Sequence, residues 1–554
     1  MNTFDSARRD LLKLGSIGLA ATLPTAFAVA GASTPSSSPG SIAGRPLASV
    51  FDIRSYGAVS DGKTLATAAI NAAIEAAAQA GGGTVYLPGG TWLSFSIHLK
   101  SNVELYLAQG CRLLAADSPL PGQTTGYQGG TYDPAEPNTT WDAYQDYGHN
   151  HWHNSLLWGE DLHDLAITGP GLIDGKGLSH GRNPKKEPDG APFVAEQAGV
   201  GNKAIALKNC RNVLIRDISI LKAGHFGLLL TGVDNLTIDN LRIDTDRDGM
   251  DIDCCKNVRV SNCTVNSPWD DAICPKSSFA LGYARATENV TITNCYVTGC
   301  YELGTLMDGS FKKYPDSNHI SRTGRIKCGT ESNGGFKNIT ISNCVFEGCQ
   351  GLALESEDGA LLEDITISNI TMRDLVSPPV FMRLGARLRG PKASTQVGTL
   401  RRILIDNLVS YNGNATFSSI LSGIPGSQIE DVKLANIFVE HKGGGTTAMA
   451  QIDPPENVAG YPDPHMFGPM PTQGFYIRHL RNLEMSHVEV RPMAPDLRPS
   501  FYLKDVDRAD FIAVTAPTSA ELPAFRLDQV TDLRILISRA AKDTQLATAS
   551  NQTI

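Results

Sequence analysis

The nonapeptide NVRVSNCTV, residues 257–265, alternates apolar and polar side chains, and its pattern recurs along the chain. The pattern begins at residues 212, 235, 257, 289, 338, 364, 402, 431 and 482, so its shortest spacings are 22 (257 minus 235) and 23 (235 minus 212) residues. Alternation with a period of two predicts a β-strand with one buried face. Each repeat is therefore predicted to supply one such strand.

A single strand of this kind cannot bury its apolar face alone, so we expect the repeats to stack ~4.8 Å apart as coils of an all-β parallel solenoid. The longer spacings are interpreted as the same coil with inserted loops. A β-propeller is the alternative architecture, but its blades need about 40 residues and four strands each. The 22-residue step disfavours the propeller.

Two residue types recur at fixed places in the repeat. Asparagines are expected to form an internal ladder at the bends: Asn240, Asn262, Asn294, Asn343, Asn369, Asn407 and Asn436. Cys263, Cys295 and Cys344 follow the asparagine in three coils, and we expect them to fill the core as a stack of buried thiols. The chain has eleven cysteines, an odd number that cannot all pair internally.

The segments on either side of the repeats suggest how the solenoid ends. Residues 64–80 have helical spacing and strong helix formers, which predicts a helix that caps the N-terminal end of the core. The Gly-, Pro- and aromatic-rich segments 118–155 and 443–480 are either walls of a binding groove or decorative surface loops. We predict one solenoid domain over residues 50–515, with 516–554 as its C-terminal end and tail.

The N-terminal residues resemble an export signal. Arg8 and Arg9 precede a short apolar run and small residues, as in a twin-arginine signal peptide over residues 1–30, followed by a Ser- and Pro-rich linker over 31–49. A short amphipathic helix is the alternative. The prediction is a periplasmic or secreted protein, a monomer that is not inserted in the membrane after signal cleavage.

Composition limits the possible partners. Formal net charge is −9 and the sequence pI is about 5.8, which argues against a general nucleic-acid binder. A protein of this charge can bind an acidic polymer only through a local cluster of basic residues.

Acidic residues gather at one point of the coil. Counting thirteen residues from four successive repeat starts reaches His225, Asp248, Asp270 and Glu302. Equal spacing predicts that these four form a column on the outer face of the following strand, with Asp271 beside it. Stacked carboxylates repel one another and raise some pKa values.

Such a column fits acid–base chemistry. Two carboxyl groups held at different pKa values are what glycoside hydrolysis requires. A solvated acidic face is one alternative, and a calcium site is another, because clustered carboxylate oxygens suit Ca²⁺.

Four stretches resemble glycoside hydrolase family 28, the polygalacturonase family of right-handed parallel β-helices. DRDGMD (246–251) resembles its NTDGxD motif, WDDAICPKS (269–277) its GDDxxxxKS motif, and GRIK (324–327) its RIK motif. The opening FDIRSYGAVSDGKT, from residue 51, is similar to the usual entry to such a helix. The resemblance covers roughly residues 50–510 and implies a single-stranded right-handed β-helix that hydrolyses pectic polysaccharide.

The resemblance also implies roles for the site residues. Asp270 corresponds to the general acid, and Asp248 and Asp271 to the pair that activates water for attack with inversion. Arg325 and Lys327 correspond to cations that bind the sugar carboxylate, and Lys276 either joins them or is a counter-ion for Asp253. Glu302 and His225 are further candidates for substrate binding. Neither a metal nor another cofactor is expected.

The sequence departs from the family's pattern at two places, and the second bears on the substrate. The asparagine of the first motif is Asp246, and the family's GHG histidine is missing, since GCYELGTLMDGS (299–310) places Glu302 or Gly304 there. His225 either substitutes in part or is an ordinary surface histidine. The glycan is homogalacturonan, rhamnogalacturonan or another uronic-acid polymer. The rival hypotheses are a calcium-dependent, pectate-lyase-like enzyme and a non-catalytic solenoid that binds or adheres.

Overall fold

The structure is a computed structural model that describes residues 49–120, 122–146, 148–179, 197–318 and 320–554. The predicted signal peptide (1–30) and nearly all of the predicted linker (31–49) lie outside the described residues. None of the helices in the described ranges has the length and apolar character to cross a membrane.

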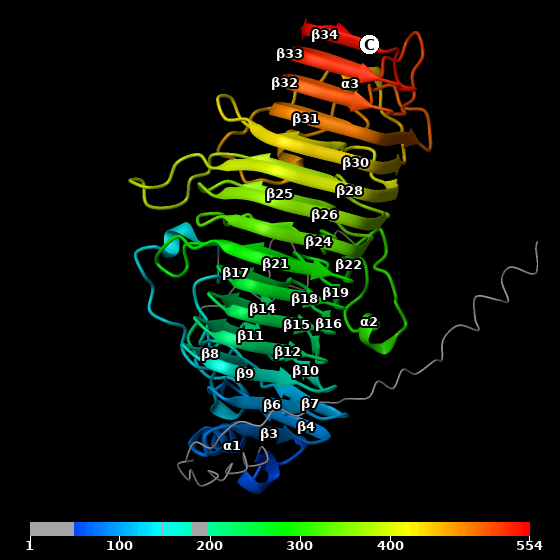
Figure 1. Ribbon diagram of the computed structural model, residues 1–554. Coiled ribbons are helices and arrows are strands. Elements are labelled where there is room, and N and C mark those ends of the chain that lie inside the picture. Colours follow the sequence, from blue (N-terminus) through cyan, green and yellow to red (C-terminus); the bar gives the residue numbers. More distant parts are fainter. Residues whose placement is uncertain (1–48, 121, 147, 180–196, 319) are drawn as a thin grey trace, which may run out of the picture. The chain divides into compact units, whose positions relative to one another are not determined.

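The described chain is a right-handed parallel β-helix in which three strands make each coil (Figure 1). The first row of strands is β1 (Val50–Asp52), β3 (Gly83–Leu87), β6 (Val103–Leu107), β9 (His163–Thr168), β12 (Arg211–Arg216), β15 (Asp234–Asp239), β18 (Lys256–Ser261) and β21 (Thr287–Thr293). The second row is β2 (Asp61–Leu65), β4 (Gly90–Ser94), β7 (Cys111–Ala115), β10 (Leu172–Asp174), β13 (Ser219–Leu221), β16 (Arg242–Asp244), β19 (Thr264–Asn266) and β22 (Tyr296–Thr298).

The third row carries the acidic residues. It contains β5 (Ile97–His98), β8 (Leu157–Glu160), β11 (Lys203–Lys208), β14 (Phe226–Thr231), β17 (Asp248–Asp253), β20 (Ile273–Lys276), β23 (Lys327–Cys328), β25 (Leu352–Ser356), β27 (Val380–Leu384) and β29 (Ser419–Ser422). Later coils have longer strands that turn through more than one row: β24 (Phe336–Glu347), β26 (Leu361–Arg373), β28 (Thr399–Gly413), β30 (Ile429–His441), β31 (Phe475–Pro492), β32 (Phe501–Ile512) and β33 (Phe525–Leu536).

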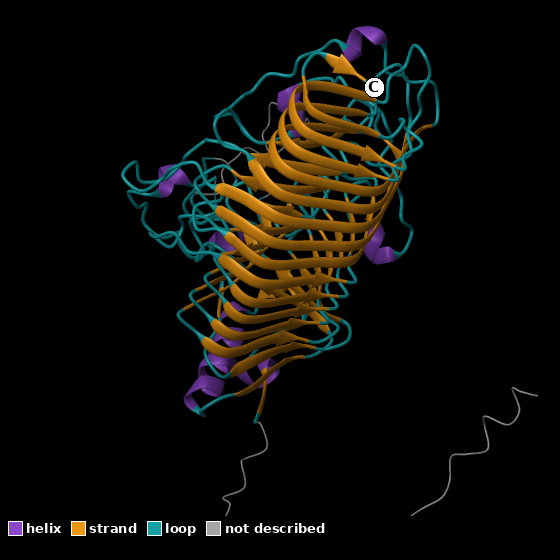
Figure 2. Cartoon of the chain, turned by 45° about the horizontal axis from the view of Figure 1, so that its top comes forward, coloured by secondary structure: helices purple, strands orange, loops and turns teal. Residues whose placement is uncertain are grey.

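The repeat predicted from the sequence sets the register of the first row. Val213 lies opposite Leu236, which lies opposite Val258, and all three are buried in one continuous apolar core. Figure 2 shows the strands stacked in layers with the long loops outside them. The parallel stack continues to Leu536 and ends in the antiparallel strands β34 (Thr544–Ala549) and β35 (Gln552–Thr553).

The helix predicted over residues 64–80 is α1 (Thr67–Gln79). It begins later than predicted because residues 61–65 form β2 and pair with β4. Ile70 and Ile74 of α1 enter the core at the N-terminal end of the stack, so the helix covers that end. The two other α-helices, α2 (Thr305–Asp308) and α3 (Thr447–Ala450), are single turns in loops.

The prediction of an internal asparagine ladder was wrong about its location. All seven asparagines are exposed, and they occupy left-handed turns with φ between 52° and 58°. Their amide groups bond to the preceding coil, as where Asn369 donates to Asn343 Oδ1 at 3.1 Å. Asparagine suits these bends because it tolerates positive φ and bonds locally, rather than because it fills the core.

The prediction of buried thiols is confirmed. Cys263, Cys295 and Cys344 are each at most 2% exposed and belong to the core. All eleven cysteines lie in the described part of the chain, and each is a buried free thiol.

Candidate active site

The predicted aspartates lie at the start of two neighbouring strands of the third row. Asp248 is the first residue of β17, and Asp270 and Asp271 precede β20. The Gly249 N–H donates to the Asp271 carbonyl at 2.9 Å, so the two chain segments run side by side there. One carboxylate oxygen from each of the three aspartates lies within 4.8 Å of the others.

The three carboxyl groups differ in exposure. Asp248 and Asp271 are 3% and 1% exposed, whereas the Asp270 side chain is 26% exposed and pairs with Arg247 at 2.8 Å. The alternative of a solvated acidic face does not fit Asp248 and Asp271, because both side chains are buried.

Asp271 is held by two buried cations. Arg325 Nε lies 2.9 Å from Asp271 Oδ1, and Lys327 Nζ pairs with Asp271 Oδ2. Burial alone would raise the pKa of Asp271, but the charges of Lys327 and Arg325 outweigh it and hold that pKa well below its usual range. Asp271 is thus ionised, and its charge is neutralised by both cations that were predicted to bind substrate.

Asp248 and Asp251 have the opposite environment. Burial, followed by the charges of Asp251 and Asp270, raises the pKa of Asp248 well above its usual range. Burial raises the pKa of Asp251 to about 7, although Lys276 and His149 act against the shift. Neutral and ionised carboxyl groups therefore lie side by side, as acid–base chemistry requires.

Lys276 lies within this group. Its Nζ is 3.9 Å from Asp251 Oδ2 and 3.8 Å from Glu331 Oε2, and the side chain is 5% exposed. The counter-ion role considered for it towards Asp253 is not what the structure shows, since the nearest carboxylates are Asp251 and Glu331.

Glu302 does not belong to the column. It lies in the long connection between β22 and β23, where Lys312 Nζ pairs with it at 2.7 Å. The place predicted for Glu302 is taken by residues 325–328, because Ile326 pairs directly with Ile273 and the Ala272 N–H donates to the Arg325 carbonyl. Counting from the repeat failed here because a loop is inserted inside the coil, between its second and third strands.

The register of the column also differs by one residue. Asp248 lies opposite Phe226 rather than His225, because residues 222–225 separate β13 from β14 whereas only 245–247 separate β16 from β17. His225 is nonetheless near the site and is buried, with its ring stacked on Phe226 at 4.2 Å. Burial, followed by the charge of Arg247, lowers its pKa well below the usual range for histidine.

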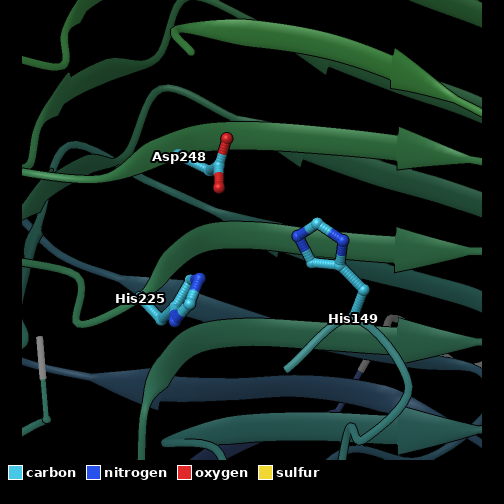
Figure 3. Close-up of side chains that lie close together, drawn as sticks. All are labelled: His149, His225 and Asp248. Atoms are coloured by element: carbon cyan, nitrogen blue, oxygen red, sulfur yellow. The ribbon is translucent and has the colours of Figure 1, made fainter. Parts of the chain in front are cut away.

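The sequence did not predict His149, which the loop over 118–155 brings into the site. One ring nitrogen of His149, one of His225 and one oxygen of Asp248 lie within 4.8 Å of one another (Figure 3). His149 Nδ1 bonds to Glu331 Oε2, and its Nε2 lies 3.5 Å from Asp251 Oδ2. The only signal in the sequence was the aromatic- and histidine-rich composition of that loop.

The cations bear on the calcium alternative. The oxygens of Asp248, Asp270 and Asp271 are close enough to share an ion, but Arg325 and Lys327 already occupy both oxygens of Asp271. A divalent cation would have to displace or repel these charges, so the donor set fits a metal poorly. A second group, Glu136, His153 and Glu160, lies on the loop and β8, where Lys208 pairs with Glu160 at 2.8 Å.

Comparison with protein-family models agrees with this site. The model described as glycosyl hydrolases family 28 matches residues 135–307, which include the three aspartates. The model described as rhamnogalacturonase A/epimerase, pectate lyase-like, matches residues 50–111. Arg325 and Lys327 lie beyond both matched ranges.

Curated relatives are distant and are matched in part. A probable polygalacturonase of Vitis vinifera is 26% identical over 52% of this chain and 58% of its own length. An exo-poly-alpha-D-galacturonosidase of Dickeya chrysanthemi is 25% identical over 43% of this chain and 42% of its own length. The chain thus spans about half the length of these two relatives.

Solved structures share the fold. An exopolygalacturonase from Thermotoga maritima superposes with a TM-score of 0.57 and 17% identity, covering 80% of this chain and 92% of that one. A family 28 exopolygalacturonase from Yersinia enterocolitica gives a TM-score of 0.53 and 17% identity, covering 90% of this chain and 79% of that one.

Proposed function

We propose that this chain, whose residues 135–307 match the model of glycosyl hydrolases family 28, hydrolyses O-glycosidic bonds of galacturonic-acid-containing pectic polysaccharide or oligosaccharide. The observation that carries the proposal is the gathering of Asp248, Asp270 and Asp271 from neighbouring coils, with carboxylate oxygens within 4.8 Å of one another, beside the buried cations Arg325 and Lys327. Two cations keep Asp271 ionised, while burial raises the pKa of the neighbouring Asp248 and Asp251.

The proposed reaction is a single displacement. A water oxygen between Asp271 and Asp248 attacks the anomeric carbon, and its proton passes to Asp271. The bond from that carbon to the leaving oxygen breaks, and the leaving oxygen takes a proton from Asp270. Asp270 suits this role because it is the most exposed of the three aspartates, where a departing sugar has room. Attack opposite the leaving group inverts the configuration.

Galacturonic acid is proposed as the sugar because relatives with a similar sequence are named for it. The match of residues 50–111 to the rhamnogalacturonase A/epimerase model favours rhamnogalacturonan as the second candidate. The Arg8–Arg9 pattern supports export to the periplasm or medium.

The test is a panel of defined homogalacturonan and rhamnogalacturonan oligosaccharides, with products identified by mass spectrometry and the first-formed anomer by ¹H NMR. Hydrated products with the inverted anomer are expected. Products 18 mass units lighter, with an unsaturated uronate, would instead indicate a lyase. A first-formed anomer with retained configuration would refute the single displacement while leaving hydrolysis in place.

A further inference from the structure

The outer face of the third row is buried along most of the stack. On this face, one residue from each strand lies opposite the corresponding residue of the next strand, and together they form a line along the stack. Each residue of the line is at most 3% exposed: Ala206, Leu229, Asp251, Cys274, Lys327, Ala353, Phe381, Ile420, Tyr476 and Tyr502. Alternate residues of the same strands, such as Leu228 and Leu354, face the core instead. A solenoid face that held an extended polymer would leave this line open to solvent.

The loop over 118–155 covers the line on the side of the N-terminal coils. Trp152 packs with Ala206, Phe226 and Leu229 in an apolar cluster outside the main core. The Trp152 indole donates to Thr231 Oγ1 at 3.1 Å, and the Lys208 ammonium lies 4.5 Å from the Trp152 ring centre. This loop is therefore fixed to the sheet by both apolar and polar contacts.

The loop that precedes β31, within the segment 443–480, covers the line on the side of the C-terminal coils. Phe467 and Met470 pack with Phe381, Ile420 and Tyr476 in a second such cluster. Buried arginines hold the loop's backbone: Arg383 donates to the Glu456 and Asn457 carbonyls, and Arg478 donates to the Pro454 and Pro455 carbonyls. This loop also lies directly on the sheet.

Both loops contact the segment between β27 and β28. Asp146 of the first loop pairs with Arg389 at 2.5 Å, and Arg387 lies 5.8 Å from the ring centre of Tyr461 in the second loop. Tyr461 is 55% exposed, and the half-buried pair Asp270 and Arg247 also remains in part open to solvent.

We propose that the site is a pocket closed along the solenoid axis in both directions, so that the enzyme removes sugars from one end of a chain rather than cutting within it. The inference rests on the proposed glycosidase function. A polymer that crossed the site would have to lift one loop and expose Trp152 or Phe467. Exposing either buried aromatic ring is unfavourable, and the hydrogen bonds that hold the loop would be lost as well.

End-blocked substrates test the proposal. One set of galacturonide oligomers is reduced to the alditol at the reducing end, and the other carries a 4,5-unsaturated uronate at the non-reducing end. The pocket must bind one terminus, so one block is expected to lower kcat/KM by ~10²-fold or more and the other by less than ~2-fold. On polymer, one short product is expected from the start, with little early loss of viscosity.

Comparable hydrolysis of both blocked sets, with mixed products and an early fall in viscosity, would overturn the pocket while the glycosidase function stands. Failure to hydrolyse any unblocked galacturonide or rhamnogalacturonan oligomer would overturn the function itself, and this inference with it.

A pair of tyrosine variants adds a second test. Tyr461→Ala removes the aromatic ring at the mouth and is expected to lower kcat/KM on unblocked oligomers by ~10-fold, as for the loss of one stacked ring. Tyr411→Ala, at a 39% exposed ring on the first two rows of strands, is the matched control and is expected to behave as the wild type. Equal activity of the two variants would contradict the placement of Tyr461 at the opening of the pocket.

Discussion

Replacing Lys327 with methionine distinguishes two roles for this cation. Methionine keeps most of the volume of the buried side chain but removes its charge. Lys327 pairs with Asp271, and Arg325 Nε lies 2.9 Å from the same carboxylate. If Lys327 serves mainly to keep Asp271 ionised, the variant should raise the pKa of Asp271.

The size of the effect follows from Coulomb's law. Two unit charges 4 Å apart interact by ~4 kcal/mol at an effective dielectric constant of 20. Since 1.36 kcal/mol corresponds to one pKa unit, the pKa of Asp271 should rise by about 2–3 units. The acidic limb of the kcat–pH profile should move upward by the same amount. At a pH below the acidic limbs of both enzymes, kcat of the variant should therefore be ~10²–10³-fold lower than that of the wild type.

The assay is initial rate on an unblocked galacturonide across pH, with far-UV circular dichroism and thermal unfolding to show that the variant folds. Lys327→Arg keeps the charge and should restore the wild-type limb. Lys312→Met removes a surface lysine paired with Glu302 and is the control. An unmoved limb with a raised KM, specific to uronic-acid substrates, would refute this reasoning and return Lys327 to the role of substrate-carboxylate ligand.

Four further predictions follow from the same geometry. Asp270→Asn should lower kcat on polymer by ~10³-fold, within the 10²–10⁴ range typical of lost proton donation. A substrate with a very good leaving group should recover part of the lost kcat. If the variant keeps more than about a tenth of wild-type kcat, another residue is the acid. Glu302→Gln should change kcat/KM by less than ~2-fold, because Glu302 pairs with Lys312 outside the site, and a loss as large as that of Asp270→Asn would refute its placement. Activity should survive exhaustive EDTA treatment, because hydrolysis by two carboxyl groups uses no cation, whereas a loss restored by calcium would favour a lyase. Burial raises the pKa of Asp251 and Glu355 to about 7 and of Glu357 to about 8, so the protonated groups stabilise the fold fully below their unfolded pKa near 4 and lose that contribution as pH rises through 7–8. The melting temperature measured by calorimetry should therefore fall from pH 5 to pH 8. Glu355→Gln should make this fall smaller.

The periodic part of the fold could be predicted because each coil repeats the same physical requirement. One buried strand face and one bend at positive φ recur, and the residue types that satisfy them recur as well. The asparagines marked the bends correctly, but their position outside the core did not follow from spacing. Polar side chains that bond between coils do so equally well on either side of the backbone.

The site was predicted in part because its residues come from adjacent coils. Asp248 and Asp270, with Asp271 beside them, could be brought together by spacing, but single-residue differences between turns displaced His225, and an inserted loop displaced Glu302. His149 could not be predicted in this way. It reaches Asp251 from a loop that follows no repeat, and such a contact depends on tertiary packing alone.

The register of a single strand creates the asymmetry between the aspartates. Residues 325–328 pair with β20, so the backbone brings Arg325 and Lys327 to Asp271 rather than to Asp248. Asp248 and Asp251, one coil away, share the burial of Asp271 without cations paired to both oxygens, and their pKa values rise. A parallel solenoid places chemically identical side chains at regular spacing, which would give them similar acidities. The inserted loop before residue 325 breaks that regularity, because it lets a cationic strand occupy the next coil, and a row of equal acids becomes one ionised and one protonated group.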